Sequence, residues 1–207
     1  YWSSSIKIML VGRETAGWNT DNNKNTINRV AEFVEKDKVF ELLCEATGRY
    51  KKHLPVSRGG KVITKTRSRF KQYFFRLAKE LDVSPKSIVY GNIFAWDYNK
   101  KSPRIRPGNE FEEITSISKK LLASQIKHFQ PDVVIFAAGF VGIDSIIKQL
   151  FNENFSGYKN KEVVSGKYWE FEAGNATCFR IAHPRATHGH GEFRDQVIQR
   201  IKARVAD

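Results

Sequence analysis

The sequence has few cysteines, few prolines and no long apolar run. Only 2 cysteines and 6 prolines occur among 207 residues. Two cysteines cannot form a disulfide framework, and Cys44 and Cys178 lack metal-ligand spacing, so we expect both to be buried, small apolar side chains. No apolar run is long enough to span a bilayer and no signal peptide opens the chain. We therefore expect a cytoplasmic protein that makes no membrane contact.

Acidic residues are also in short supply. Lys and Arg number 35 against 22 Asp and Glu, which gives a net charge of +13. Between Ala46 and Lys79 there is no acidic residue, but there are eleven basic ones: Arg49, Lys51, Lys52, Arg58, Lys61, Lys65, Arg67, Arg69, Lys71, Arg76 and Lys79. Solvated protein faces normally mix both signs, so this segment favours contact with phosphate groups. Nucleic acid is the leading partner, ahead of an anionic membrane surface.

The apolar residues follow the pattern of an α/β fold. Strand-like runs occur at 6–11, 87–94, 132–138, 163–172 and 177–182, and helical spacing at 27–48, 67–81, 111–129, 143–150 and 193–205. Strands that alternate with helices predict a mainly parallel central sheet with helices on both faces. Without repeats or linkers, residues 1–207 form one predicted domain. It carries a basic loop and helix insertion at about 46–79, with Gly48 ending a helix and Gly59-Gly60 at the loop tip.

Polar side chains follow three of the predicted strands. Glu14 lies just beyond the first strand, Asn92 ends the second, and His183 follows the last. Pro184 keeps His183 in an extended conformation. Ligands of open α/β sheets bind at the carboxyl ends of the strands. A carboxylate, an amide and an imidazole at that edge predict a functional site.

Each of these residues also has an ordinary interpretation when it is taken alone. Glu14 could form a surface salt bridge, Asn92 could be a turn residue, and His183 could be a loop histidine with its hydrogen bonds satisfied. Residues 12–17 lack the glycine spacing of dinucleotide and P-loop sites. His188 and His190 suggest a metal, but no Cys, Asp or Glu completes a ligand set at familiar spacing. We expect no metal and no cofactor.

Taken together, the three segments resemble the uracil-DNA glycosylase superfamily in order and spacing. Residues 11–14 (Val-Gly-Arg-Glu) resemble its first motif, residues 90–94 (Tyr-Gly-Asn-Ile-Phe) its second, and residues 183–185 (His-Pro-Arg) its third. The stretch from Leu121 to Gly139 resembles the helix, proline, strand and glycine of the family's middle. The resemblance therefore covers nearly the whole chain and implies the fold of that family.

The resemblance implies a monofunctional DNA glycosylase that acts on a flipped nucleotide. Glu14 and His183 become the catalytic residues: Glu14 positions the water or stabilises the sugar cation, and His183 donates to the leaving base. Asn92 reads the flipped pyrimidine. The iron–sulfur branch of the family needs four cysteines, so no cluster is expected in this chain.

The chain also departs from the family pattern. The best-known branch has a bulky tyrosine that excludes C5-substituted bases, whereas Ala16 and Gly17 stand nearest to that place here. Uracil is the family's usual substrate. The extra room beside Ala16 and Gly17 adds C5-modified pyrimidines, including hypermodified phage cytosines, to the expected substrates. The implied role is DNA repair or anti-phage defence. Trp18, Phe94 and Trp96 are the candidates for stacking on the base.

Further residues are expected to hold the DNA. Arg185, Thr187 and His188 are alternatives for filling the gap that the flipped nucleotide leaves. The candidates for phosphate contacts are Arg58, Lys61, Lys65, Arg67 and Arg69. Two other functions stay open: a catalytically inactive DNA-binding module with a glycosylase fold, and a small-molecule nucleotide hydrolase, which would leave the net positive charge without a role.

Overall fold

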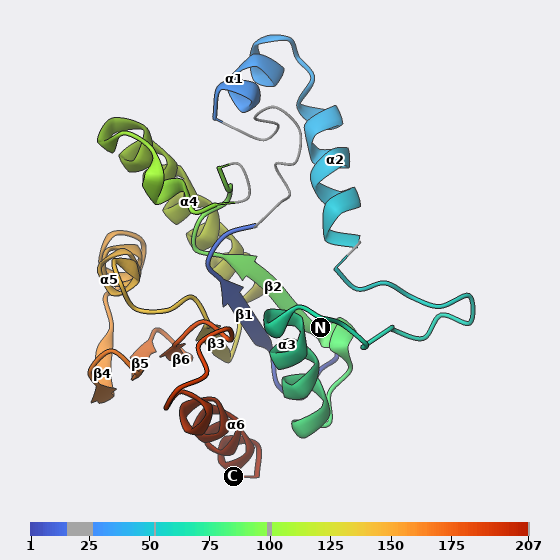
Figure 1. The fold of residues 1–207 in the computed structure, drawn as a ribbon, viewed down its shortest axis with the longest axis vertical. Coiled ribbons are helices and arrows are strands. Elements are labelled where there is room, and N and C mark those ends of the chain that lie inside the picture. Colours follow the sequence, from blue (N-terminus) through green and yellow to red (C-terminus); the bar gives the residue numbers. More distant parts are fainter. Residues whose placement is uncertain (16–26, 52, 99–100, 207) are drawn as a thin grey trace. The chain divides into compact units, whose positions relative to one another are not determined.

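The structure, a computed structural model, describes residues 1–15, 27–51, 53–98 and 101–206. Its strands form one six-stranded sheet in the order β2-β1-β3-β6-β5-β4 (Figure 1). The strands are β1 (Ile8–Gly12), β2 (Ile88–Asn92), β3 (Val133–Phe136), β4 (Lys159–Val164), β5 (Tyr168–Ala173) and β6 (Ala176–Ile181). The α-helices are α1 (Ile27–Glu35), α2 (Val39–Lys51), α3 (Arg69–Glu80), α4 (Gly108–Phe129), α5 (Ile143–Asn154) and α6 (Gly191–Ala206). Two short 3-10 helices are η1 (Pro85–Ser87) and η2 (Pro103–Ile105).

Four neighbouring strands of the sheet, β2, β1, β3 and β6, are parallel, and β5 and β4 continue it in antiparallel fashion. Residues of β1 and β3 such as Leu10 and Ile135 are completely buried, as expected for strands covered on both faces. Figure 1 shows α3 and α6 on one face of the sheet, and α5 with the second half of α4 on the other. These observations confirm the predicted α/β class with a mainly parallel sheet.

The contacts of the chain divide it into two compact units. The first comprises residues 1–13, 64–93 and 119–207 and holds the whole sheet. The second comprises residues 14–63 and 94–118 and holds α1, α2 and the first half of α4. The basic segment at 46–79 is therefore shared between the two units, and the single domain over 1–207 stays a prediction.

The prediction of one strand over 163–172 is wrong, because β4 and β5 form an antiparallel hairpin there. The turn lies at residues 165–167, where Gly166 has a φ of 67° and the Lys167 amide donates to the Val164 carbonyl at 3.0 Å. β4 lies at one edge of the sheet, and its register against β5 shifts between Asn160 and Glu162. The alternation of side chains continues on both sides of the turn, which hides it in the sequence.

The prediction of one helix over 27–48 is also wrong. Asp37 has a φ of 53°, in the left-handed region, and separates α1 from α2. Gly48 does not end a helix, because α2 continues through it to Lys51. The predicted loop tip at Gly59-Gly60 is confirmed: the chain turns there, with Gly60 at a φ of 77°.

The two cysteines differ in their surroundings. Cys178 on β6 is buried, as expected, and burial raises the pKa of its thiol. Cys44 on α2 is exposed, so the expectation that both are buried was wrong for this residue. Helical spacing alone does not show which face of α2 is covered.

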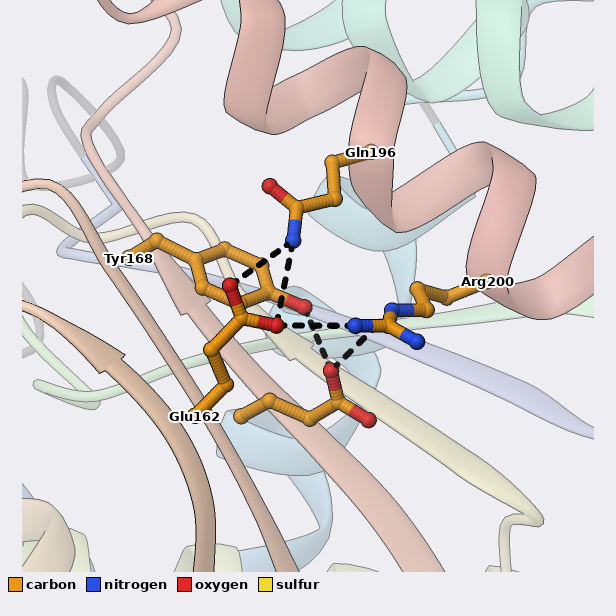
Figure 2. A network of polar contacts seen from close by, with 5 residues as sticks. Glu162, Tyr168, Gln196 and Arg200 are labelled. Atoms are coloured by element: carbon orange, nitrogen blue, oxygen red, sulfur yellow. Dashed lines mark hydrogen bonds and ion pairs between the residues drawn. The ribbon is translucent and has the colours of Figure 1, made fainter.

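A polar network joins α6 to the antiparallel part of the sheet (Figure 2). Arg200 on α6 lies between two carboxylates, with its Nη2 2.8 Å from Glu162 Oε2 and its Nε 3.5 Å from Glu170 Oε2. The Tyr168 hydroxyl donates to Glu170 at 2.7 Å, and Gln196 Nε2 donates to Glu162 at 3.3 Å. Both carboxylates are engaged by neighbours, so we assign the network to holding α6 against β4 and β5.

Candidate functional site

The carboxyl ends of β1 and β2 place Gly12 beside Asn92, which is its register partner. A Cβ atom at Gly12 would lie 2.8 Å from Asn92 Oδ1 and 3.2 Å from Phe70 Cε2. Only glycine therefore allows the Asn92 amide and the Phe70 ring to come this close to the end of β1. Asn92 is only 8% exposed, so its amide is held in a buried setting.

Tyr90 orients the Asn92 side chain. Its hydroxyl donates to Asn92 Oδ1 at 3.0 Å, from two residues earlier on the same strand. This bond holds the amide oxygen on the Tyr90 side, so the amide NH2 group, which is a donor, faces elsewhere. The Tyr90 ring in turn packs edge-on against Phe70, with ring centroids 5.3 Å apart.

His183 lies directly beyond β6, in a loop that is tied by backbone hydrogen bonds. The Ala186 amide donates to the His183 carbonyl at 2.8 Å, which closes a turn over residues 183–186. Arg194 Nη1 on α6 donates to the Ala186 carbonyl at 3.0 Å. The Arg185 amide donates to His183 Nδ1 at 3.2 Å, so the ring itself is oriented by the turn.

The His183 ring is kept neutral. Burial lowers the pKa of His183 to about 4, and the nearby positive charges of Arg185 and Arg13 lower it in the same direction. A neutral imidazole carries one proton, and Nδ1 accepts a hydrogen bond from the Arg185 amide. The proton is therefore on Nε2, and His183 presents a neutral N–H donor at neutral pH.

We expect His183 to titrate near pH 4, against about 6.5 for a histidine in an unfolded chain. Between these values the unfolded chain binds more protons, so the contribution of His183 to stability falls as the pH drops from about 6.5 to about 4. A two-dimensional NMR titration of the histidine rings measures this pKa. Arg185→Gln should raise it while leaving it below 6.5, because burial is the largest cause, and Arg185→Lys should change it little. A His183 pKa near 6.5 in the unmodified protein would contradict the neutral donor.

Phe70 links the two halves of this site. The ring centroids of Phe70 and His183 are 6.4 Å apart, and Phe70 also contacts Tyr90 and the end of β1. β2 and β6 are separated by two strands, so their ends lie roughly 14 Å apart, and the half-buried Phe70 occupies part of that interval. The structure thus brings Asn92 and His183 together around one aromatic ring. Sequence reasoning missed Phe70, because its spacing with Phe74 assigns it to the core-facing side of the helix.

The second unit contains Glu14, which is half-buried. The adjacent Thr15 hydroxyl donates to Asp97 Oδ2 at 2.5 Å, and Asp97 is only 3% exposed. This bond joins the segment after β1 to the segment after β2. Sequence reasoning missed Asp97, although a carboxylate five residues beyond Asn92 was a visible signal. Glu14, Thr15 and Asp97 all belong to the second unit.

The three aromatic candidates for stacking on the base differ in their surroundings. Phe94 is 0% exposed and packs against Phe111, with ring centroids 5.7 Å apart, so it belongs to the core of the second unit. Trp96 is half-buried. Trp18 lies outside the described residues, as do Ala16 and Gly17.

The candidates for DNA contacts lie on the surface. Arg185, Thr187 and His188 are exposed, and Thr187 Oγ1 lies 3.3 Å from His188 Nδ1. The basic candidates are all exposed: Arg58 and Lys61 in the second unit, and Lys65, Arg67 and Arg69 in the first. The latter three lead directly into the first turn of α3, which carries Phe70.

No protein-family model and no curated protein matches the chain. Among the residues that the structure describes, His, Cys, Asp and Glu side chains form no group of three or more that could hold a metal ion. None of the described helices combines the length and apolar character needed to cross a membrane. The most distinctive polar geometry at the sheet edge is therefore the arrangement of Asn92, His183 and Phe70.

Proposed function

We propose that the chain is a monofunctional DNA glycosylase. It hydrolyses the N-glycosidic bond of a flipped uracil or C5-modified pyrimidine and leaves an abasic site. The observation that carries this proposal is the arrangement of a neutral His183 and a buried Asn92 amide around Phe70. It supplies an N–H donor, an amide and an aromatic ring at one sheet edge.

His183 suits the departing base. When the N-glycosidic bond breaks, its electron pair leaves with the base, positive charge develops on the sugar, and a water oxygen then bonds to the sugar carbon. The water gives up one proton, and the base takes up one. The neutral Nε2–H group of His183 donates a hydrogen bond to a base oxygen as negative charge grows there, and removing one such donor typically costs about 100- to 1,000-fold in rate.

Asn92 and Phe70 suit recognition of the base. An amide that offers both a donor and an acceptor pairs with one edge of a pyrimidine. Its orientation by Tyr90 and its burial reduce the freedom lost on binding. The half-buried Phe70 ring provides a surface on which a flipped base stacks, so we add Phe70 to the proposed site.

Glu14 is proposed to act on the sugar. It follows Gly12 by two residues, and two residues of chain span at most about 7 Å. Its Cα therefore lies within about 7 Å of the Cα of Gly12, the register partner of Asn92. A carboxylate there stabilises the positive charge on the sugar or orients the attacking water.

The exposed cations supply the energy for extrusion of the nucleotide. Flipping costs a few kcal/mol. Lys65, Arg67 and Arg69 precede or begin the helix that carries Phe70, so phosphates held by them lie near the proposed base site. Contacts of this kind weaken steeply with salt, and we expect DNA binding by this chain to do the same.

The test is abasic-site formation, detected as strand breaks under alkali. Matched DNAs carry uracil, thymine, 5-hydroxymethylcytosine or its glucosylated form. We expect release from at least one DNA, reduced about 100-fold or more in His183→Ala and in Glu14→Ala. His128→Ala is the matched control, because His128 is an exposed histidine at the end of α4.

The pattern of release identifies the role. Release of uracil alone supports DNA repair, and release of a glucosylated or hydroxymethylated base supports anti-phage defence. Wild-type rates in both His183→Ala and Glu14→Ala would contradict the proposed catalytic residues. The exposed basic residues favour one second candidate, an inactive DNA-binding module, and salt-sensitive binding to every DNA without base release would establish it.

A further inference from the structure

Two large apolar side chains are exposed beside the His183 loop. Phe140 is 40% exposed and Val141 is 60% exposed, and both lie in the loop between β3 and α5. β3 is the neighbour of β6 in the sheet, and the Gly139 amide donates to the Ile181 carbonyl at the end of β6 at 3.2 Å. The pair therefore stands at the carboxyl edge, next to the strand end that leads into His183.

The backbone under this pair is tightly constrained. Gly139 and Gly142 flank it, with φ values of 84° and 68°. The Ile143 amide donates to the Phe140 carbonyl at 3.0 Å. Asp144, the next residue, forms an ion pair with the buried Arg180 of β6 at 2.7 Å. A loop held in this way presents Phe140 and Val141 in a fixed position, so binding through them orders little additional chain.

The surroundings of the pair are basic. The Phe140 ring lies 3.6 Å from the position of a Cβ atom at Gly166, in the β4–β5 turn. Lys167 Nζ of that turn lies 3.9 Å from the corresponding position at Gly189, beyond His183. These contacts gather the three loops, residues 139–142, 165–167 and 183–190, at one edge. They contain Lys167 and Arg185 and no acidic residue.

We infer that Phe140 and Val141 insert into the nucleic acid and stack on the base beside the flipped nucleotide. The apolar pair matches the π-faces of bases, and the cations around it match the phosphates on either side. This inference rests on the proposed function, because it assumes a nucleotide extruded toward Asn92 and His183. It replaces the earlier alternatives of Arg185, Thr187 and His188 as the residues that fill the gap.

The inference is tested on DNA that already contains a gap. A duplex with a tetrahydrofuran abasic site and an otherwise identical intact duplex are titrated with protein, and binding is followed by fluorescence anisotropy. We expect the unmodified protein to prefer the abasic duplex, and Phe140→Ser/Val141→Ser to lose on the order of tenfold of that preference. Phe140→Leu should retain most of it. Val163→Ala is the matched control, because Val163 is equally exposed but lies on the outer strand β4.

Excision separates this inference from the proposed function. If bases are released, the double variant should slow release from a duplex by a larger factor than release from a single strand. Suppose instead that the double variant slows release from the duplex and from the single strand by the same factor and still prefers the abasic duplex. That result would overturn the inference but would not contradict the proposed glycosylase activity. If the unmodified protein released no base but preferred the abasic duplex, and the double variant lost that preference, the result would support the inference and refute the proposed glycosylase activity. The unmodified protein could also prove to be a dimer that the double variant converts to a monomer. That result would overturn the inference, because Phe140 and Val141 would then contact a second copy of the chain.

Discussion

We expect Gly12→Ala to lower the rate of base release about 100-fold while the protein stays folded. The new Cβ would lie 2.8 Å from Asn92 Oδ1 and 3.2 Å from the Phe70 ring, so both side chains must move. Misplacement of a recognition group by about 1 Å can cost about 100-fold in rate. The contacting atoms belong to side chains that can shift, so the stability cost is about 1–3 kcal/mol, within the total of a typical domain.

Abasic-site formation measures the rate of base release, and urea unfolding of the same preparations measures the loss of stability. Gly48→Ala is the control: Gly48 is exposed on α2, and among the residues that the structure describes no atom from outside its own stretch of helix lies within 4 Å of its Cβ position. Alanine should stabilise that helix by about 0.5–1 kcal/mol and leave base release unchanged. If Gly12→Ala released the base as fast as the unmodified protein, Asn92 and Phe70 would not form the recognition site.

The second large effect concerns stability: Asp144→Ala should lower the free energy of unfolding by about 3–5 kcal/mol. Arg180 is only 1% exposed, and its Nε and Nη2 lie 2.7 and 2.9 Å from the two Asp144 carboxylate oxygens. Removing the carboxylate leaves a buried guanidinium without its counter-charge. The loss should also loosen the loop between β3 and α5 that carries Phe140, because Asp144 is the second residue of α5.

Urea unfolding followed by circular dichroism measures this loss. Glu153→Ala serves as the matched control, because the pair between Glu153 and Lys119 has a half-exposed carboxylate and should contribute at most about 1 kcal/mol. The double variant Arg180→Met/Asp144→Leu removes both charges and should regain most of the stability. A loss below 1 kcal/mol for Asp144→Ala would contradict the importance of the buried pair.

Much of the sheet could be predicted from the sequence. The apolar runs of β1, β2, β3 and β6 are those of strands covered on both faces, and each lies within two residues of its predicted position. The β4–β5 hairpin could not be predicted as easily, because alternating side chains run up to both sides of Gly166. The break at Asp37 was hidden in the same way, since apolar spacing continues from α1 into α2.

The candidate site could be predicted only in part. The strand ends place Asn92 and His183 at one edge, because parallel strands all end there. The contribution of Phe70 depends on where the first turn of α3 packs, which no local pattern of that helix determines. The neutral state of His183 arises from burial and from the charges of Arg185 and Arg13, which come from separate parts of the chain.

The outer strand β4 has a consequence for behaviour at high concentration. A sheet edge exposes unpaired backbone groups on which the strand of another molecule can add, which is a common route to aggregation. β4 carries the exposed Lys159 and Lys161, and its register shifts between Asn160 and Glu162. Charged side chains and an irregular ladder both oppose the addition of a strand, so the β4 edge, one of the two edges of the sheet, resists pairing with a second molecule.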